Sequence, residues 1–244
     1  MTPDEILAVK IGDRTIGENL QRAIAAEIVR ERDDGSLEFA PTASSDLFMK
    51  IYNAPAPDCG FLNRFMFRAV YQEAAVPAGC EHCYKVKVLP RTLRQLVAAY
   101  EVALNVNCVS KWGVDFFNRY SQSLYAGYFY VNGIEDARAL FPLVRALIDE
   151  HGKLGAEVPV LIKRGCSNYE AVLGPSDTYE FRPELRHIEA YIKSRFRTKG
   201  QKPNALAPLL YGKWVPFAFQ SGDDTYLDFT DGRPLYRKSL SYDP

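Results

Sequence analysis

The alternation of apolar patterns between Tyr84 and Arg164 limits the possible folds more than any other feature of the chain. Period-two and short apolar runs, which are typical of strands, alternate with stripes at i, i+3 and i+4, which are typical of amphipathic helices. The strand candidates cover residues 84–89, 109–117, 124–131 and 158–163, and the helical stripes cover residues 93–104 and 140–148. The predicted order is therefore strand, helix, strand, strand, helix, strand.

This order is the split βαβ arrangement of ferredoxin-like domains, so we predict an α+β fold with a βαββαβ core over residues 80–170. Residues 1–79 are expected to form an N-terminal helical segment packed on the core, and residues 171–244 a C-terminal α/β extension. The sequence contains no linker long enough to force a second domain, so one compact unit is predicted.

The two flanking segments carry weaker patterns. Residues 4–32 have a helical pattern with a break at Gly12 and Gly17, and another helix with a wide apolar stripe begins near Gly60. In the extension, a helix is predicted over residues 183–195. The aromatic residues of 206–242 favour strands and loops.

Charge and hydropathy exclude several classes of protein. Thirty basic residues balance thirty acidic ones, which argues against a dedicated polyanion-binding protein. No run approaches the roughly 18 apolar residues of a membrane span, and the first residues do not resemble a secretory signal. We therefore expect a cytoplasmic protein with no membrane partner. In that reducing compartment, clustered cysteines are more often metal ligands or redox groups than disulfides.

Four of the five cysteines are predicted to meet at one edge of the sheet. Cys80 and Cys83 come directly before the first strand of the core, and Cys166 comes directly after the fourth. These two strands are antiparallel neighbours in the order 4-1-3-2 of a βαββαβ sheet. Cys59 begins a helix whose far end leads back to Cys80. The topology therefore predicts a metal site made of Cys59, Cys80, Cys83 and Cys166.

The residues around these cysteines favour a thiolate site. Cys59 lies at a predicted helix N-terminus, where unpaired N–H groups and the helix dipole lower the pKa of a thiol. Gly79 and Gly165 allow the close backbone approach and unusual dihedral angles of ligand loops. Lys163 and Arg164 place two cations beside Cys166, where they balance an anionic thiolate site or cluster, or bind an acidic partner.

The pattern leaves two candidates for the bound group. Structural zinc sites usually draw on two short-range pairs, whereas here the ligands are scattered and aromatic residues flank them. This favours an iron–sulfur cluster slightly over zinc. A redox-active dithiol of Cys80 and Cys83 is a further alternative, and His82 is expected to face solvent. Cys108, expected at the opposite end of the sheet, is predicted to be a core cysteine.

One face of the predicted sheet is a second candidate site. The segment Gly127–Val131 (GYFYV) resembles the core of the RNP1 signature of the RNA-recognition motif, in which two alternating aromatic residues stack on bases. The resemblance implies a single-stranded nucleic-acid-binding face formed by Tyr128 and Tyr130, with Lys85 and Lys87 beside them. It covers five residues and lacks the leading basic residue. The alternative is that the aromatic C-terminal segment covers this face and buries the tyrosines.

The sequence lacks the motifs of several enzyme classes, and it does not decide whether the protein is an enzyme. It contains no GxGxxG, Walker A, HExxH or GxSxG motif, and no C-x3-C-x2-C loop. The leading hypothesis is a non-hydrolytic protein with a four-cysteine iron–sulfur or zinc site, acting as a structural or redox component of a larger assembly with a protein partner. A nucleic-acid-binding subunit with a structural metal and a dithiol redox enzyme are the alternatives.

Overall fold

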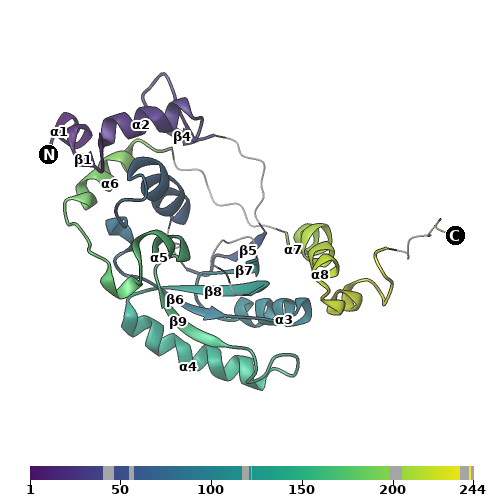
Figure 1. Ribbon diagram of the computed structural model, residues 1–244. Coiled ribbons are helices and arrows are strands. Elements are labelled where there is room, and N and C mark those ends of the chain that lie inside the picture. Colours follow the sequence, from purple (N-terminus) through teal and green to yellow (C-terminus); the bar gives the residue numbers. More distant parts are fainter. Residues whose placement is uncertain are drawn as a thin grey trace.

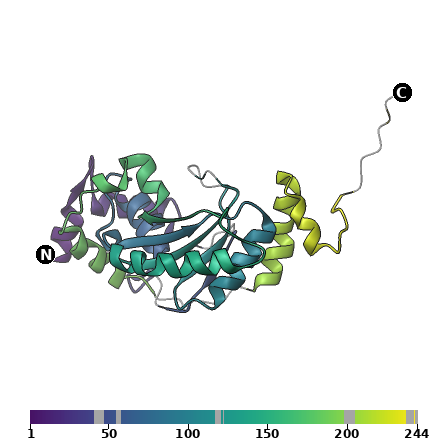
Figure 2. The same ribbon diagram turned by 90° about the horizontal axis from the view of Figure 1, so that it is seen from below.

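The computed structural model describes residues 1–40, 47–54, 58–116, 121, 123–197, 205–236 and 242. The fold is of the α+β class, as predicted, with a five-stranded sheet at its centre (Figure 1). Helices α3 and α4 lie along one face of the sheet, and the N-terminal helices lie beyond the other. Helices α7 and α8 lie at the end of the molecule opposite the N-terminus (Figure 2).

The central part of the chain alternates strands and helices. Its elements are β6 (Cys83–Val88), α3 (Leu93–Leu104), β7 (Ser110–Val114), β8 (Tyr125–Asn132), α4 (Ile134–Glu150) and β9 (Val160–Arg164). They follow one another in the order that the sequence patterns predict. The side chain of Thr92 caps α3 by accepting a hydrogen bond from the backbone N–H of Gln95 at 3.2 Å. Part of the predicted strand at 109–117 and of the polar turn that follows lies outside the described residues.

The sheet contains one strand that the sequence analysis did not predict. This strand, β5 (Phe48–Ile51), pairs with β7, so the spatial order is β5-β7-β8-β6-β9. All neighbouring strands are antiparallel. Strand β6 therefore lies between β8 and β9, and its first residues lie beside the last residues of β9. The register pairs Tyr84 with Arg164 and Cys83 with Asn132.

The largest hydrophobic core fills the space between the sheet and helices α3 and α4. Val86 and Val88 point into it from β6 and are fully buried, as the period-two pattern predicts. Leu96 of α3 and Val144 of α4 meet them from the helical layer. The alternate residues of β6, which include Lys85, point to the opposite face of the sheet.

A second hydrophobic core joins the N-terminal segment to helix α6 (Leu185–Ser194) of the C-terminal extension. Its other elements are α1 (Pro3–Ala8), β1 (Lys10–Ile11), α2 (Ile16–Ala25), β3 (Val29–Glu31), β4 (Leu37–Phe39) and η1 (Gly60–Val70), and β2 (Arg14–Thr15) pairs with β1. The prediction of a helical pattern over residues 4–32 with a break at Gly12 and Gly17 is correct at Gly12, but Gly17 lies within α2 and the residues from Val29 form β3. Gly12, with φ +62°, turns the chain into the β1–β2 hairpin, and Thr15 then caps α2.

The prediction of strands after residue 205 is wrong for the described residues. They form α7 (Leu206–Leu209), η4 (Leu210–Trp214), α8 (Val215–Ser221) and η5 (Asp224–Phe229). Leu210, Trp214 and Ala218 are spaced by four residues and pack against the main core, so the segment has a helical period. The aromatic residues of this segment favour strands, and the prediction followed them instead of the helical period.

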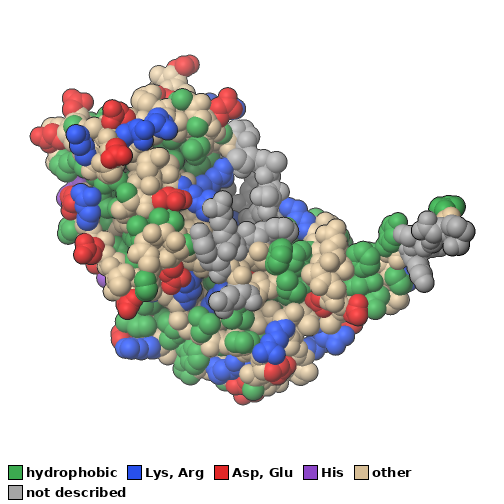
Figure 3. All heavy atoms as spheres, in the orientation of Figure 1, with side chains coloured by type: hydrophobic (Ala, Val, Ile, Leu, Met, Phe, Trp, Pro, Cys, Tyr) green, Lys and Arg blue, Asp and Glu red, His purple; other side chains and the backbone are tan. Residues whose placement is uncertain are grey.

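The surface of the face in Figure 3 carries basic and acidic side chains interspersed over the N-terminal part, in line with the balanced composition. Among the described residues, every helix is too short or too polar to cross a bilayer.

Candidate metal centre

The pairing of β6 with β9 brings Cys166 to the loop that carries Cys80 and Cys83. The backbone N–H of Gly165 donates to the carbonyl of Cys83 at 2.8 Å, which joins the end of β9 to the start of β6. Arg164 donates from its guanidinium to the carbonyl of Glu81 at 3.2 Å, within the C-x2-C loop. Two independent contacts therefore hold the segment before Cys166 against the segment of Cys80 and Cys83.

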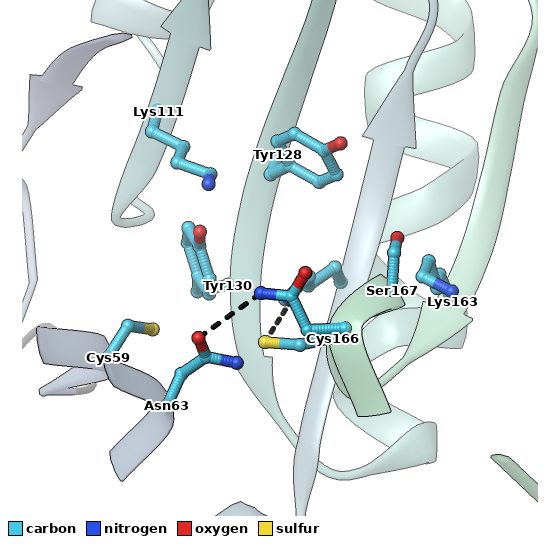
Figure 4. Close-up of a pocket in the computed structure, with 10 residues that line it drawn as sticks. Cys59, Asn63, Lys111, Tyr128, Tyr130, Lys163, Cys166 and Ser167 are labelled. Carbon is cyan, nitrogen blue, oxygen red and sulfur yellow. Dashed lines mark hydrogen bonds between the residues drawn. The ribbon is translucent and has the colours of Figure 1, made fainter. Parts of the chain in front are cut away.

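Cys59 reaches the same region from the start of η1. Asp58 begins this helix, because its carboxylate accepts a hydrogen bond from the backbone N–H of Phe61 at 3.0 Å. Helix η1 then lies over the face of the sheet that α3 and α4 leave open. Cys59 and Cys166 line the same cavity on that face, on either side of Asn63 in the close-up (Figure 4).

The four thiols lie close enough to affect one another's ionisation. Burial raises the pKa of Cys59, and Cys166 raises it further. Burial likewise raises the pKa of Cys80 well above its usual value, with additional contributions from Cys166, Cys83 and Cys59. The pKa of Cys83 rises to about 11, chiefly through burial, with contributions from Cys166 and Cys59. Each pair among the four therefore interacts electrostatically.

These pKa directions correct one prediction. The sequence analysis expected the helix N-terminus to lower the pKa of Cys59, but burial dominates and raises it. A buried thiol stays protonated at neutral pH unless a metal or a cation stabilises the thiolate. The thiols of Cys59, Cys80 and Cys83 are therefore expected to be protonated at neutral pH in the unliganded fold.

Two side chains hydrogen-bond the sulfurs of this group. The ammonium of Lys85 lies 3.4 Å from Cys166 Sγ and donates at 2.7 Å to the carbonyl of Gly165. The hydroxyl of Tyr169, a fully buried side chain of α5 (Ser167–Leu173), lies 3.4 Å from Cys80 Sγ. Donors of this kind stabilise bound thiolates and tune the potential of iron–sulfur clusters.

The loop that precedes Cys80 is held by a buried carboxylate that the sequence analysis missed. Glu189 of α6 accepts from the N–H of Ala78 at 2.7 Å, from the N–H of Gly79 at 2.8 Å and from the hydroxyl of Tyr71 at 3.0 Å. Burial raises the pKa of Glu189. A sequence signal existed, because this acidic residue lies in the apolar stripe of its helix beside Ile188 and Ile192.

The two glycines of the ligand loops have different roles. Gly165 has φ +63°, a conformation that a side chain would strain, so it turns the chain between β9 and Cys166. Gly79 allows close packing instead, because a Cβ there would lie 2.8 Å from Cδ2 of Leu62. The predicted tolerance for unusual dihedral angles therefore applies to Gly165 alone.

Cys108 belongs to the main core and lines a groove together with Cys83, so its predicted position is wrong. Strands β6 and β7 run parallel on either side of β8, so Cys108 lies at the same end of the sheet as Cys83 and not at the opposite end. Its thiol is buried in the main core and donates to the carbonyl of Tyr130 at 3.2 Å. The interpretation as a core cysteine holds, and His82 is exposed to solvent as predicted.

The lysines and tyrosines of the open sheet face are largely covered. Tyr128 is 6% exposed and donates from its hydroxyl to Asp115 at 2.8 Å, and Lys85 is 4% exposed. Tyr130 is half-buried, and Lys87 forms an ion pair with Asp115 at 3.7 Å. The covering residues come from η1 and α5, whereas the sequence analysis named the C-terminal aromatic segment. Base stacking on Tyr128 would require these elements to move.

The two predicted cations beside Cys166 point in different directions. Lys163 lines the cavity that contains Cys59 and Cys166 and forms an ion pair with Glu170. Arg164 points to the other face, where its guanidinium lies 5.0 Å from the ring centroid of Phe181 and 5.6 Å from that of Tyr84. Lys163 is therefore placed to face a bound group, and Arg164 stabilises the loop.

The donor set is that of a thiolate-bound group, but the thiols are not gathered around one point. All five cysteines are free thiols. In the part of the chain that the structure describes, no three His, Cys, Asp or Glu side chains are arranged to hold a single metal ion. Of these four thiols Cys80 is buried and the other three are partly exposed, so the sulfur donors are present without the closed arrangement of a single-ion site.

Comparisons of this chain with family models, with curated proteins and with solved structures found no match.

Proposed function

We propose that the protein binds an iron–sulfur cluster through Cys59, Cys80, Cys83 and Cys166 and acts as a structural or redox component of a larger assembly. The observation that carries the proposal is that these four thiols, from three separate segments of the chain, lie close enough to interact electrostatically. Burial disfavours the ionisation of Cys59, Cys80 and Cys83, and a metal cluster would offset that cost by binding the thiolates.

The arrangement supports a cluster over zinc. Structural zinc sites usually draw on two short-range pairs of ligands, whereas these four cysteines come from three separate segments of the chain. Iron–sulfur clusters accept ligands with wider sequence spacing. Lys85 and Tyr169 supply the hydrogen bonds to sulfur that set the potential of a cluster.

Each neighbouring residue has a defined task in this proposal. When bound, the cluster supplies one-electron transfer or a structural cross-link. Lys85 supplies positive charge and a hydrogen bond at Cys166, and Tyr169 orients the thiol of Cys80. Glu189 holds the loop before Cys80, and Phe67 packs on Tyr169 with ring centroids 4.5 Å apart. Burial by these aromatic side chains limits contact of the sulfurs with water.

The strand order supports a ferredoxin-like core within this fold. Strands β9, β6, β8 and β7 lie side by side in the order 4-1-3-2 that a βαββαβ unit requires, with β5 added at one edge. We also infer a reducing, cytoplasmic location from the free thiols.

Anaerobic purification followed by iron and acid-labile sulfide analysis tests the proposal. We expect a brown protein with equal amounts of iron and sulfide and a broad absorption band near about 400 nm that bleaches on reduction. Colourless protein with one zinc ion per chain would show that the cysteines hold a structural zinc ion and not a cluster. Protein without metal after anaerobic reconstitution would refute both.

A further inference from the structure

A cavity of about 130 Å³, whose lining includes Cys59 and Cys166 of the candidate metal centre, lies between η1, α5 and the open face of the sheet (Figure 4). A cavity of this order is large enough for a group the size of benzene. Three lysines line it from three strands: Lys85 of β6, Lys111 of β7 and Lys163 of β9. Three ammonium groups around so small a space repel one another unless an anion lies between them.

The lysines have few carboxylates to balance them. Lys163 forms an ion pair with Glu170. Within the described ranges, the structure places no carboxylate at ion-pair distance from Lys85 or from Lys111. The ammonium of Lys111 instead lies over the ring of Tyr128, 4.9 Å from its centroid. Burial and the nearby charge of Lys85 lower the pKa of Lys111, against smaller opposing contributions from Cys166, Cys59 and Asp115.

Neutral side chains add further donors to the cavity. Ser167 and Asn168 line it from the start of α5, and Asn63 lines it from η1. Asn168 donates to Asn63 Oδ1 at 3.3 Å, and Asn63 in turn interacts with the hydroxyl of Tyr169. The cavity is therefore rich in donors as well as in positive charge.

A wider groove adjoins the cavity and shares Lys163 and Ser167 with it. Its volume is about 520 Å³, which lies in the usual range of small-molecule sites. Leu89, Leu161 and Ala171 give it an apolar lining. The pair of spaces thus has a cationic inner end and a more apolar outer part.

We propose that the cavity of Lys85, Lys111 and Lys163 binds the anionic group, a phosphate or a carboxylate, of a small organic ligand whose apolar part lies in the adjoining groove. The inference rests on the proposed function only in that Cys59 and Cys166 line the same cavity, which would place a bound cluster at its wall. The three lysines line the cavity whichever group the cysteines bind.

Titration calorimetry on the full chain tests the proposal with four probes. Phenyl phosphate and benzoate carry the two candidate anions with an apolar ring, inorganic phosphate lacks the ring, and benzyl alcohol lacks the charge. We expect one of the two ring-bearing anions to bind more tightly than inorganic phosphate and benzyl alcohol. Lys111→Met keeps the length of the side chain and should weaken that binding by about tenfold, the loss expected for one charged contact. Lys153→Met, which changes an exposed lysine, is the matched control and should bind as the unaltered protein does.

Two further variants distinguish a loss of binding from a folding defect. Lys163→Gln should also weaken the binding of both inorganic phosphate and the ring-bearing anion. Leu161→Gln should weaken only the ring-bearing anion, because Leu161 lines the groove and not the cavity. The inference would be overturned if Lys111→Met and Lys163→Gln bind the anions as tightly as the unaltered protein does. It would also be overturned if the unaltered protein binds no anion at millimolar concentration.

Iron analysis of each variant separates this inference from the proposed function. If the protein carries no cluster but binds the anion, and Lys111→Met loses that binding, the inference is supported and the cluster is refuted. If the protein carries a cluster but binds no anion, the cluster is supported and the inference is refuted. If Lys111→Met lowers the iron content while no form binds an anion, the lysine only balances the charge of the cluster and the inference fails.

Discussion

The ammonium of Lys85 lies 3.4 Å from the sulfur of Cys166, on a strand neighbouring the one that leads to this cysteine. Lys85 is 4% exposed, so the interaction is shielded from water. Burial opposes the charge of Lys85, but the thiols at 166, 83 and 59 outweigh it and raise the pKa of this lysine. A buried cation beside a cysteine is expected where the sulfur carries negative charge in the functional state.

Replacement of Lys85 should therefore change the redox potential of the bound cluster. Lys85→Met removes the hydrogen bond and the positive charge, both of which favour the more negative, reduced state. We expect the reduction potential to fall by about 60 mV, the equivalent of about 1.4 kcal/mol for one electron. Redox titration monitored by electron paramagnetic resonance measures the shift. Lys153→Met should leave the potential unchanged, and an unchanged potential in Lys85→Met would contradict a cluster at Cys166.

The carboxylate of Glu189 should stabilise the loop before Cys80. Glu189→Gln replaces one acceptor oxygen by an NH2 group, which leaves either Gly79 or Ala78 without its partner. We expect the free energy of unfolding of the apoprotein to fall by about 1–3 kcal/mol in urea. Glu184→Gln, at an exposed residue next to the same helix, should change it by less than about 0.5 kcal/mol. Equal effects of the two variants would show that the buried contacts contribute nothing.

Of the two glycines in the loops of the metal centre, Gly165 should tolerate substitution less well. Gly165→Ala forces a side chain into the left-handed region and places its Cβ 3.3 Å from Tyr179 Cε2. We expect a loss of about 1–2 kcal/mol in the free energy of unfolding, together with a lower iron content. Gly152→Ala is the control, because nothing lies within 4 Å of its added Cβ. The prediction fails if the two variants unfold at the same urea concentration.

The stability of the apoprotein should decline in alkali. The pKa of Cys83 is about 11 in the folded chain, above its usual value of 9.0. Between these values the unfolded chain has lost the proton while the folded chain retains it, so the unfolded state binds fewer protons and becomes more favourable as the pH rises. Each such thiol contributes at most about 1.4 kcal/mol per pH unit. Urea denaturation from about pH 8 to about pH 11 should show this decline, and Cys83→Ser should reduce its slope.

Cluster-loaded protein is the second control for this pH dependence. Its thiolates are already bound, so these cysteines release no protons in that range. A loaded protein with the same alkaline slope as the apoprotein would show that the thiols of the centre are not its ligands.

The sequence was sufficient to predict the central strands and helices and the proximity of Cys166 to Cys83. Strand periods and the pairing of the first and last strands depend on local patterns and on one topological rule. Strand β5 was not predicted because it has only four residues and pairs with β7, about sixty positions away. Segments of this kind are assigned by their partners and not by their composition.

The environment of the thiols could not be predicted from local sequence. The pKa of Cys59 depends on burial under elements that are distant in the chain, and this effect outweighs the helix N-terminus that the sequence reveals. Lys85 has the sequence pattern of an exposed strand residue, yet the end of β9 buries it. Only the assembled fold places its ammonium between Gly165 and Cys166.

The iron content of two cysteine variants tests the central claim most directly. Cys166→Ala removes a ligand that the β6–β9 pairing brings to Cys80 and Cys83, while Cys108→Ala removes a buried thiol at the same end of the sheet that takes no part in the centre. After anaerobic purification, we predict that Cys108→Ala retains the iron and sulfide of the unaltered protein and that Cys166→Ala loses most of both. Equal iron in the two variants would contradict a shared site for the four cysteines.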